Sequence, residues 1–227
     1  MRVVSQIDRA IKTLYNIETS LCAENFLIDS FPDKSIRKVS SKNIEGALYI
    51  KQNSPQMGSE DASIDLGIYF SPGVYEELRN FPRWSHPWTL SQLQAFSVVC
   101  EEVSHFHYLI FNLSRRRPVS EFELELQGEI DRFILMFFCE DGIEKNGARK
   151  FEELFEQLFF NYRLASFLTD VQTQRYKDAS VYAKRFFQKM KSSFSERENF
   201  SDMLKQARLF YGYDLADKVS FLLGTRL

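Results

Sequence analysis

The sequence predicts a mainly helical α+β fold, in which a small strand pair leads into a two-helix core and a helical C-terminal half. Apolar residues recur at helical spacing over most of the chain, and only residues 46–51 and 64–70 have the β-former content of short strands. The chain has 227 residues, of which 44% are hydrophobic, so it can bury a sizeable core without disulfides. Its 22 phenylalanines indicate an aromatic helical core.

The N-terminal part is expected to hold the strand pair between helices. Apolar side chains at helical spacing predict a first helix over residues 3–16, and a second helical stretch is expected over 18–28. The two strands are joined by a polar loop with Pro and Gly, and a short helix follows over residues 71–79. A connector with two prolines, residues 81–88, then leads to the central helices.

Two capping boxes predict where the central helices begin. Thr89 with Gln92 begins the first helix, and Ser120 with Glu123 begins the second, which should run to about Cys139. The expected core stripe of the first helix comprises Leu93, Phe96, Cys100, Val103, Phe106, Ile110 and Leu113. Two apolar-faced helices joined by a short loop should pack antiparallel.

The remainder of the chain has a helical pattern throughout. We therefore expect a core over residues 1–142, including the helical N-terminus, and a helical extension over 143–227 packed on that core. Helices are predicted near residues 148–168, 171–191, 197–211 and 214–223.

Composition argues against several classes of partner. The net charge is −2, and no basic stripe is present of the kind that binds a nucleic-acid backbone. No window approaches the apolar length of a membrane span, and the N-terminus lacks the apolar region of a signal peptide. The three cysteines have no metal-like spacing and fit small core residues in a reducing compartment. We therefore expect a cytoplasmic protein with no nucleic-acid or membrane partner.

Residues 101–131 contain most of the reactive side chains. Glu101 and His105 are four positions apart and share one face of the predicted helix, and Glu102 neighbours that face. In the second helix Glu129 lies in line with an apolar stripe, where a carboxylate is costly unless a cation or hydrogen bonds satisfy it. Gly128 precedes it and would permit close backbone approach. Antiparallel packing would bring Glu129 toward Glu101 and His105.

These segments resemble the motifs of a metallopeptidase family. The run EEVSH, residues 101–105, differs from HExxH by a Glu in the first position, and EIDRF, residues 129–133, looks like the stretch E-A-N-x-F-A. With the preceding strand pair, the order resembles the gluzincin metallopeptidases, most closely the ImmA/IrrE-like group, over about residues 45–140. The resemblance implies a bacterial regulatory or phage-related setting.

The resemblance also implies roles for single residues. His105 and Glu129 match the second and third metal ligands, Glu101 stands in place of the first, and Glu102 matches the general base. Because Glu101 replaces a histidine, the set is richer in oxygen and more negative, and it should hold zinc less firmly. This departure weakens the case for peptide hydrolysis.

The leading hypothesis is a non-catalytic, metallopeptidase-like cytoplasmic protein that binds or regulates a protein partner. Glu101, Glu102, His105 and Glu129 would form its buried polar cluster, either without a metal or holding one divalent ion, zinc among the candidates. One alternative is a metal-dependent, peptidase-like hydrolase, in which Glu102 takes a proton from bound water. Another is a structural helical subunit of a larger assembly.

The other two histidines are assigned to packing. His107 points away from His105 around the helix and is expected at the surface or partly buried. His86 lies in the double-proline connector, where a packed turn is the favoured interpretation.

Overall fold

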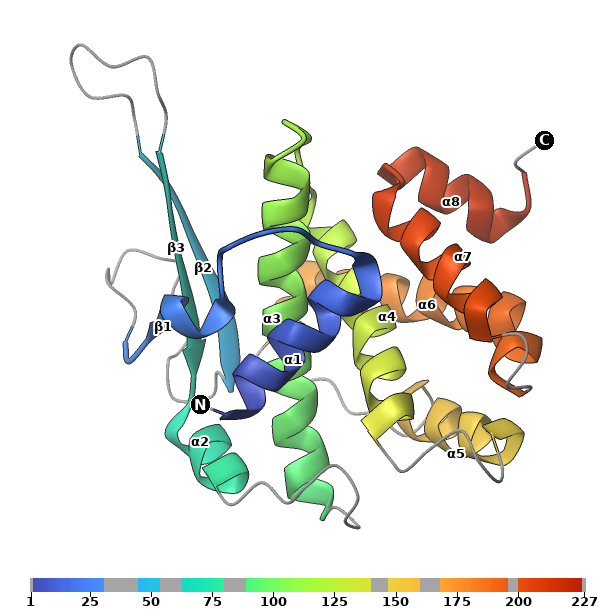
Figure 1. Cartoon of the computed structure of the whole chain (residues 1–227), viewed down its shortest axis with the longest axis horizontal. Helices are drawn as coiled ribbons and strands as arrows, with labels where there is room; N and C mark the ends of the chain where they lie inside the picture. The colour runs from blue at the N-terminus through green and yellow to red at the C-terminus, as the bar shows by residue number, and fades with distance from the viewer. Residues whose placement is uncertain are drawn as a thin grey trace.

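The computed structural model describes residues 2–30, 45–53, 63–79, 89–139, 147–159, 168–195 and 200–225. These residues confirm the mainly helical α+β class (Figure 1). The described elements are α1 (Arg2–Tyr15), the 3-10 turn η1 (Ala23–Phe26), β1 (Leu27–Ile28), β2 (Gly46–Asn53), β3 (Ser63–Phe70), α2 (Pro72–Arg79), α3 (Leu90–Leu113), α4 (Glu121–Cys139), α5 (Gly147–Phe159), α6 (Asp170–Ser195), α7 (Phe200–Gly212) and α8 (Leu215–Leu223). The sheet lies at one end of the molecule, α3 in the middle, and α7 and α8 at the opposite end (Figure 1).

The small sheet has the strand order β1-β3-β2. The predicted strand pair is confirmed as β2 and β3, which run antiparallel from Gly46 opposite Phe70 to Asn53 opposite Ser63. The helix expected over residues 18–28 is wrong, because its last residues form η1 and then β1. Strand β1 pairs parallel to β3, which supplies the hydrogen-bond partners that a helix would have found within itself.

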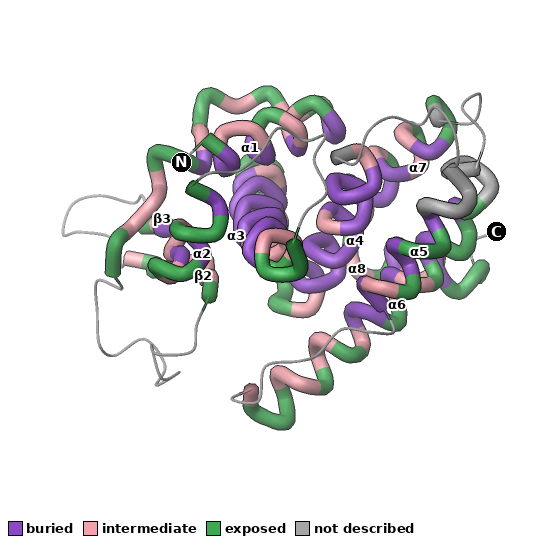
Figure 2. Tube along the Cα trace, turned by 90° about the horizontal axis from the view of Figure 1, so that it is seen from below, coloured by how far each residue is buried: buried purple, intermediate pink, exposed green. Residues whose placement is uncertain are grey.

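Helix α3 is the central element of the core. The predicted capping box is confirmed, since the Thr89 side chain accepts from the Gln92 N–H and the Gln92 side chain accepts from the Thr89 N–H. Figure 2 shows α3 as buried along most of its length, consistent with the many buried residues of this helix. The predicted core stripe is buried from Phe96 to Ile110, but Leu113, the last residue of the helix, is 37% exposed.

Helix α4 packs antiparallel against α3, as predicted. Near the start of α3, Arg132 donates to the Ser97 hydroxyl at 3.3 Å, whereas nearer its end Tyr108 donates to Glu123 at 3.4 Å. The second capping box is also confirmed, because Glu123 and Ser120 exchange side-chain and backbone hydrogen bonds of 3.0 and 3.2 Å. This antiparallel order determines which carboxylates of α4 face the histidine of α3.

The C-terminal helices bury an aromatic core against α4. The centroid of the Phe133 ring lies 4.0 Å from that of Phe187 in α6 and 5.2 Å from that of Phe151 in α5. The predicted helices of this half are confirmed where the structure describes them. The loop between β2 and β3, the connector with His86 and residues 160–167 lie outside the described residues. None of the described helices is both long and apolar enough to cross a bilayer.

Candidate metal centre

His105 lies in the middle of α3 and is 7% exposed. Its Nδ1 lies 3.5 Å from Oε2 of Glu102, one helical turn earlier on the same face. Its Nε2 lies 3.7 Å from Oε2 of Glu125, which comes from α4. One ring nitrogen therefore has a carboxylate neighbour on its own helix, while the other is directed across the helix interface.

Glu101, His105 and Glu125 each place one potential ligand atom in a common space. These three atoms all lie within 4.8 Å of one another. Glu101 joins the group because it precedes His105 by one turn of α3. Glu125 joins it because α4 approaches closely at Gly128, where a Cβ atom would fall 3.0 Å from His105 Nε2. The close approach expected for Gly128 from the sequence is thus confirmed.

Two atoms that face this space have no hydrogen-bond partner. Both His105 Nε2 and Glu125 Oε2 are buried, and neither forms a hydrogen bond within the part of the chain that the structure describes. A buried polar atom without a partner costs about 1–3 kcal/mol, so such atoms are rare in folded proteins. Two such atoms lie 3.7 Å apart here, and this arrangement indicates a position for an electron-pair acceptor such as a metal ion.

The electrostatics of the cluster also favour an added positive charge. Burial, reinforced by the charge of Glu125, raises the pKa of Glu101 to about 8. Burial likewise raises the pKa of Glu125. For His105 burial opposes the charged form, but the hydrogen bond and charge of Glu102, with the charges of Glu125 and Glu101, outweigh it and raise the pKa to about 9. The carboxylates therefore favour a positive charge between them, which either a proton on His105 or a metal ion bound in its place would supply.

Helix α6 supplies two side chains to the surroundings of this cluster. The Arg175 Nε lies 3.3 Å from Glu125 Oε1, and its Nη1 forms an ion pair with Glu121. Burial raises the pKa of the neighbouring Tyr176, and the charges of Glu101 and Glu125 raise it further. The C-terminal half of the chain thus reaches the centre that the sequence analysis assigned to the N-terminal core.

The structure brings together some of the site residues predicted from the sequence, but not all of them. Glu101 and His105 lie together, and Glu102 faces His105 Nδ1. Glu129 is buried one turn beyond Glu125, and its carboxylate forms an ion pair with Arg132. Burial raises the Glu129 pKa, whereas Arg132 lowers it. The assignment of Glu129 as a ligand stays a prediction, while Glu125 is the α4 carboxylate that shares the space with Glu101 and His105.

Sequence reasoning missed Glu125, Arg175 and Tyr176. A signal for Glu125 was present, since it precedes Glu129 by four positions and therefore shares its helix face. Arg175 and Tyr176 come from a helix 50 residues further along the chain, and no local pattern predicts which residues of that helix meet α4.

The donor set fits a divalent transition metal ion. One imidazole nitrogen and two carboxylates are ligands that zinc, manganese and iron accept. Ligating histidines usually have their second ring nitrogen bound to a carboxylate or carbonyl, which orients the ring. Glu102 stands in that position relative to His105 Nδ1. An ion held here would link α3 to α4.

His107 belongs to a second, separate polar cluster. The sequence-based expectation of a surface or partly buried position is wrong, because His107 is fully buried. Its Nε2 donates to Asp8 of α1 at 2.8 Å. Asp8 also accepts from the Ala23 N–H at 2.8 Å and pairs with Lys12 at 2.9 Å. The carboxylate from α1 satisfies Nε2 of the histidine, whereas the buried Nδ1 forms no hydrogen bond within the described residues.

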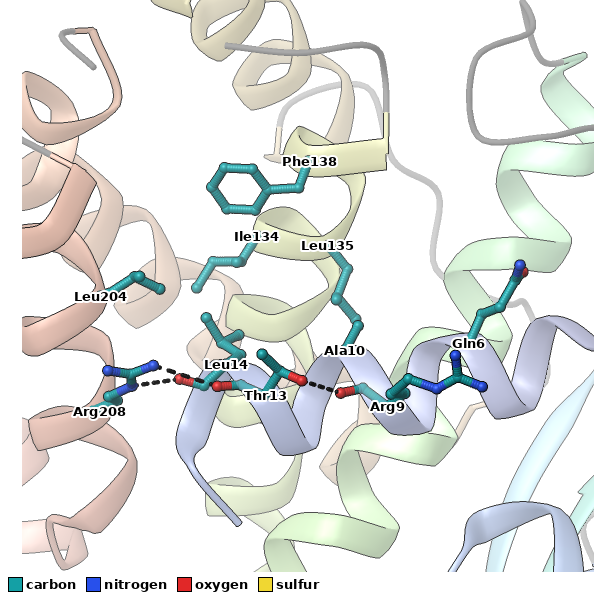
Figure 3. Close-up of a pocket in the computed structure, with 10 residues that line it drawn as sticks. All are labelled: Gln6, Arg9, Ala10, Thr13, Leu14, Ile134, Leu135, Phe138, Leu204 and Arg208. Atoms are coloured by element: carbon teal, nitrogen blue, oxygen red, sulfur yellow. Dashed lines mark hydrogen bonds between the residues drawn. The ribbon is translucent and has the colours of Figure 1, made fainter. Parts of the chain in front are cut away.

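An apolar groove lies between α1, α4 and α7 (Figure 3). Its volume is about 550 Å³, and Leu14, Ile134 and Phe138 are among its lining residues. Arg208 at one end donates to the backbone carbonyls of Leu14 and Thr13 at 2.7 and 3.3 Å, so it holds the last turn of α1. The lining residues include no acid–base cluster, and the groove lacks the chemistry seen around His105.

Comparison with known proteins adds no relative. The chain matches no protein-family model, no curated protein and no solved structure.

Proposed function

We propose that this chain binds one divalent metal ion through Glu101, His105 and Glu125, and that the ion serves a binding or regulatory role. One observation carries the proposal. His105 Nε2 and Glu125 Oε2 are buried, lack hydrogen-bond partners among the described residues, and face each other at 3.7 Å with a Glu101 oxygen nearby. A cation with three or more free coordination positions would satisfy all three groups at once.

The positions of the other carboxylates favour a non-catalytic role. Hydrolysis at a metal centre needs a general base within hydrogen-bond reach of the attacking water. Glu102 faces Nδ1 of His105, on the side of the ring away from Glu125. Glu129 is paired with Arg132. Both of these carboxylates therefore already have partners, and the site is better suited to holding an ion than to activating water.

In this proposal the ion stabilises the central helix pair. Glu101 and His105 come from α3 and Glu125 comes from α4, so one ion would connect the two helices at the middle of the fold. We include in the proposal the protein partner expected from the sequence. The ion would then act by holding α3 and α4 in place, and these two helices would give the protein the shape in which it binds its partner.

Metal content tests the proposal. Elemental analysis and titration with Zn²⁺ and Mn²⁺ should give about one ion per chain for the unaltered protein. His105→Ala and Glu125→Gln should lose the ion, whereas Glu156→Gln, which changes an exposed glutamate of α5, should retain it. Failure of the unaltered protein to bind either ion would refute the proposal. Loss in Glu129→Gln but not in Glu125→Gln would transfer the third ligand to Glu129.

A second candidate function is metal-dependent hydrolysis. Catalytic zinc sites commonly have three protein ligands and keep a position for water or substrate, and the triad offers three. This candidate predicts that the metal-loaded protein hydrolyses peptides in a mixed peptide library. Glu102→Gln should then abolish cleavage while the fold and metal content remain. Absence of cleavage by protein shown to contain the ion would eliminate this candidate.

A further inference from the structure

Arg175 is the residue of the C-terminal half that forms an ion pair with Glu125 of the candidate metal centre. It lies in the second turn of α6, which packs alongside α4 (Figure 1). The start of α6 is fixed by a capping box, since Thr169 and Gln172 exchange side-chain and backbone hydrogen bonds of 3.0 and 3.2 Å. The Arg175 side chain is 18% exposed, so its guanidinium is largely enclosed.

The guanidinium group contacts two carboxylates of α4. Its Nη1 pairs with Glu121, and its Nε lies 3.3 Å from Oε1 of Glu125. Glu121 and Glu125 are four positions apart, so they present their carboxylates on one face of α4. A planar guanidinium between two carboxylates restrains their orientation more than a single ammonium does.

The two oxygens of Glu125 consequently have different surroundings. Oε1 lies 3.3 Å from Arg175 Nε in an ion pair without a hydrogen bond, whereas Oε2 forms no hydrogen bond within the described chain and lies 3.7 Å from His105 Nε2. Arg175 contacts Oε1, whereas the oxygen proposed to bind the metal ion is Oε2. Arg175 therefore need not move when Oε2 binds an ion.

We propose that Arg175 is a positioning residue for the metal ligand Glu125: its charge attracts Oε1 and thereby directs Oε2 toward His105 and Glu101. The proposal rests on the metal site proposed above. It implies that metal affinity depends on the docking of α6 against α4, which couples the C-terminal helices to the centre. By thermodynamic linkage, metal binding would in turn stabilise the docking of α6.

A simple charge effect predicts the opposite result. A positive guanidinium close to a divalent cation repels it, so removal of the charge alone would tighten metal binding. Loss of positioning would weaken metal binding, because the Glu125 carboxylate would be free to turn. The direction of the affinity change on substitution of Arg175 thus separates the two effects.

The test is a competition titration of Zn²⁺ and Mn²⁺ against a chromophoric chelator. Arg175→Gln should weaken binding by about tenfold or more, the loss typical when an outer-shell partner of a ligand is removed. Arg175→Lys should retain part of the affinity, because an ammonium can reach one carboxylate but not restrain both. The matched control is Arg185→Gln, which removes an exposed arginine from the same helix and should leave the affinity unchanged.

A second measurement addresses the coupling. Hydrogen exchange of the amides over residues 170–180 should slow when metal is added to the unaltered protein, and this protection should be smaller in Arg175→Gln. Circular dichroism of each variant verifies that the helices are intact. Unchanged or tighter binding by a folded Arg175→Gln protein would overturn the positioning role while leaving the metal site in place. Absence of metal binding by the unaltered protein overturns the site itself, and the role of Arg175 with it.

Discussion

Gly128 lies directly against the imidazole of His105. A Cβ atom at position 128 would fall 3.0 Å from His105 Nε2 and 3.4 Å from Cγ of Glu101. Both distances are measured to residues of the candidate metal triad. The glycine therefore maintains the space between α3 and α4 in which the three ligand atoms meet.

Gly128→Ala should weaken metal binding by about tenfold, because the added methyl group occupies space beside Nε2 and displaces the ring. Its effect on stability should be small. Alanine favours the helix by ~1 kcal/mol relative to glycine, whereas overpacking costs about 1–3 kcal/mol, so the net loss should stay below roughly 2 kcal/mol. Metal titration and urea unfolding of the variant measure the two effects separately.

Gly212→Ala is the control for this substitution. Gly212 is the last residue of α7, and a Cβ atom there would meet nothing within 4 Å. It should leave metal affinity unchanged. Equal affinity in Gly128→Ala and Gly212→Ala would show that the space beside Nε2 is not used by an ion.

Glu102 offers a test of the role of the residue that resembles the general base. If its carboxylate orients His105 through Nδ1, Glu102→Ala should weaken metal binding by about 10–100-fold. Glu102→Gln retains an oxygen that accepts from Nδ1 and should lose less. A general base, by contrast, leaves metal affinity unaltered in both variants and affects only turnover. Isothermal titration of the two variants with Zn²⁺ discriminates between these roles.

Asp8 should contribute strongly to stability because it connects three parts of the fold. Its carboxylate accepts from His107 Nε2 and the Ala23 N–H, each at 2.8 Å, and pairs with Lys12. Asp8→Ala leaves buried donors without a partner and should lower the free energy of unfolding by about 3 kcal/mol. Asp8→Asn retains one acceptor and should lose less. Urea denaturation at neutral pH measures both changes.

The pH dependence gives an independent test of Asp8. Burial opposes its charged form, but the hydrogen bonds from His107, Ala23 and Lys12 outweigh burial and lower its pKa to about 2. The stabilisation is therefore complete above the ordinary value of 3.8 and is lost as the pH falls through about 2. The difference between the unaltered protein and Asp8→Ala should shrink over this window. Asp202→Ala, which alters an exposed aspartate, should show neither the neutral-pH loss nor the shrinkage.

Most elements of the fold could be predicted because their signals are local. Helix periodicity and the capping residues Thr89 and Ser120 mark the central helices. Strand β1 could not be predicted, since Leu27 and Ile28 form a strand only through their pairing with β3, about 40 residues away. The burial of His107 has the same origin, because its partner Asp8 lies 99 positions earlier.

The candidate site could be predicted in part for a similar reason. The spacing of Glu101 and His105 on one helix is visible in the sequence, and the antiparallel approach of α4 follows from its apolar stripe. The choice between Glu125 and Glu129 depends on the register of two helices, which a shift of one turn reverses. That register is set by packing around Gly128, and by the hydrogen bond from Arg132 of α4 to Ser97 of α3.

Lys218 is a buried cation at the junction of α8 with the central helices. Its Nζ donates to Gln127 at 2.8 Å and lies 4.5 Å from the Tyr108 ring centroid and 4.6 Å from that of Phe210. Burial lowers its pKa to about 7, although the charges of Glu123 and Asp131 favour the protonated form. The folded and unfolded chains therefore differ in protonation at this residue over a range that begins near neutral pH.

Lys218→Met should flatten the pH dependence of stability. Between pH of about 7 and 10.5, the unfolded chain binds a proton at Lys218 that the folded chain does not. The free energy of unfolding should consequently rise with pH in this range, by up to ~1.4 kcal/mol per pH unit, and below it the contribution should be constant. Methionine binds no such proton, so the free energy of unfolding of Lys218→Met should rise less with pH. Loss of the hydrogen bond to Gln127 changes the stability at a fixed pH but not this difference in slope.

Urea denaturation at pH 6, 7, 8, 9 and 10 measures the slope for the unaltered protein and for Lys218→Met. The control is Lys205→Met, at a lysine whose side chain is 70% exposed, which should keep the slope of the unaltered protein. Parallel curves for the unaltered protein and Lys218→Met would mean that Lys218 stays protonated in the folded chain, held by the two aromatic rings and the carboxylates of Glu123 and Asp131.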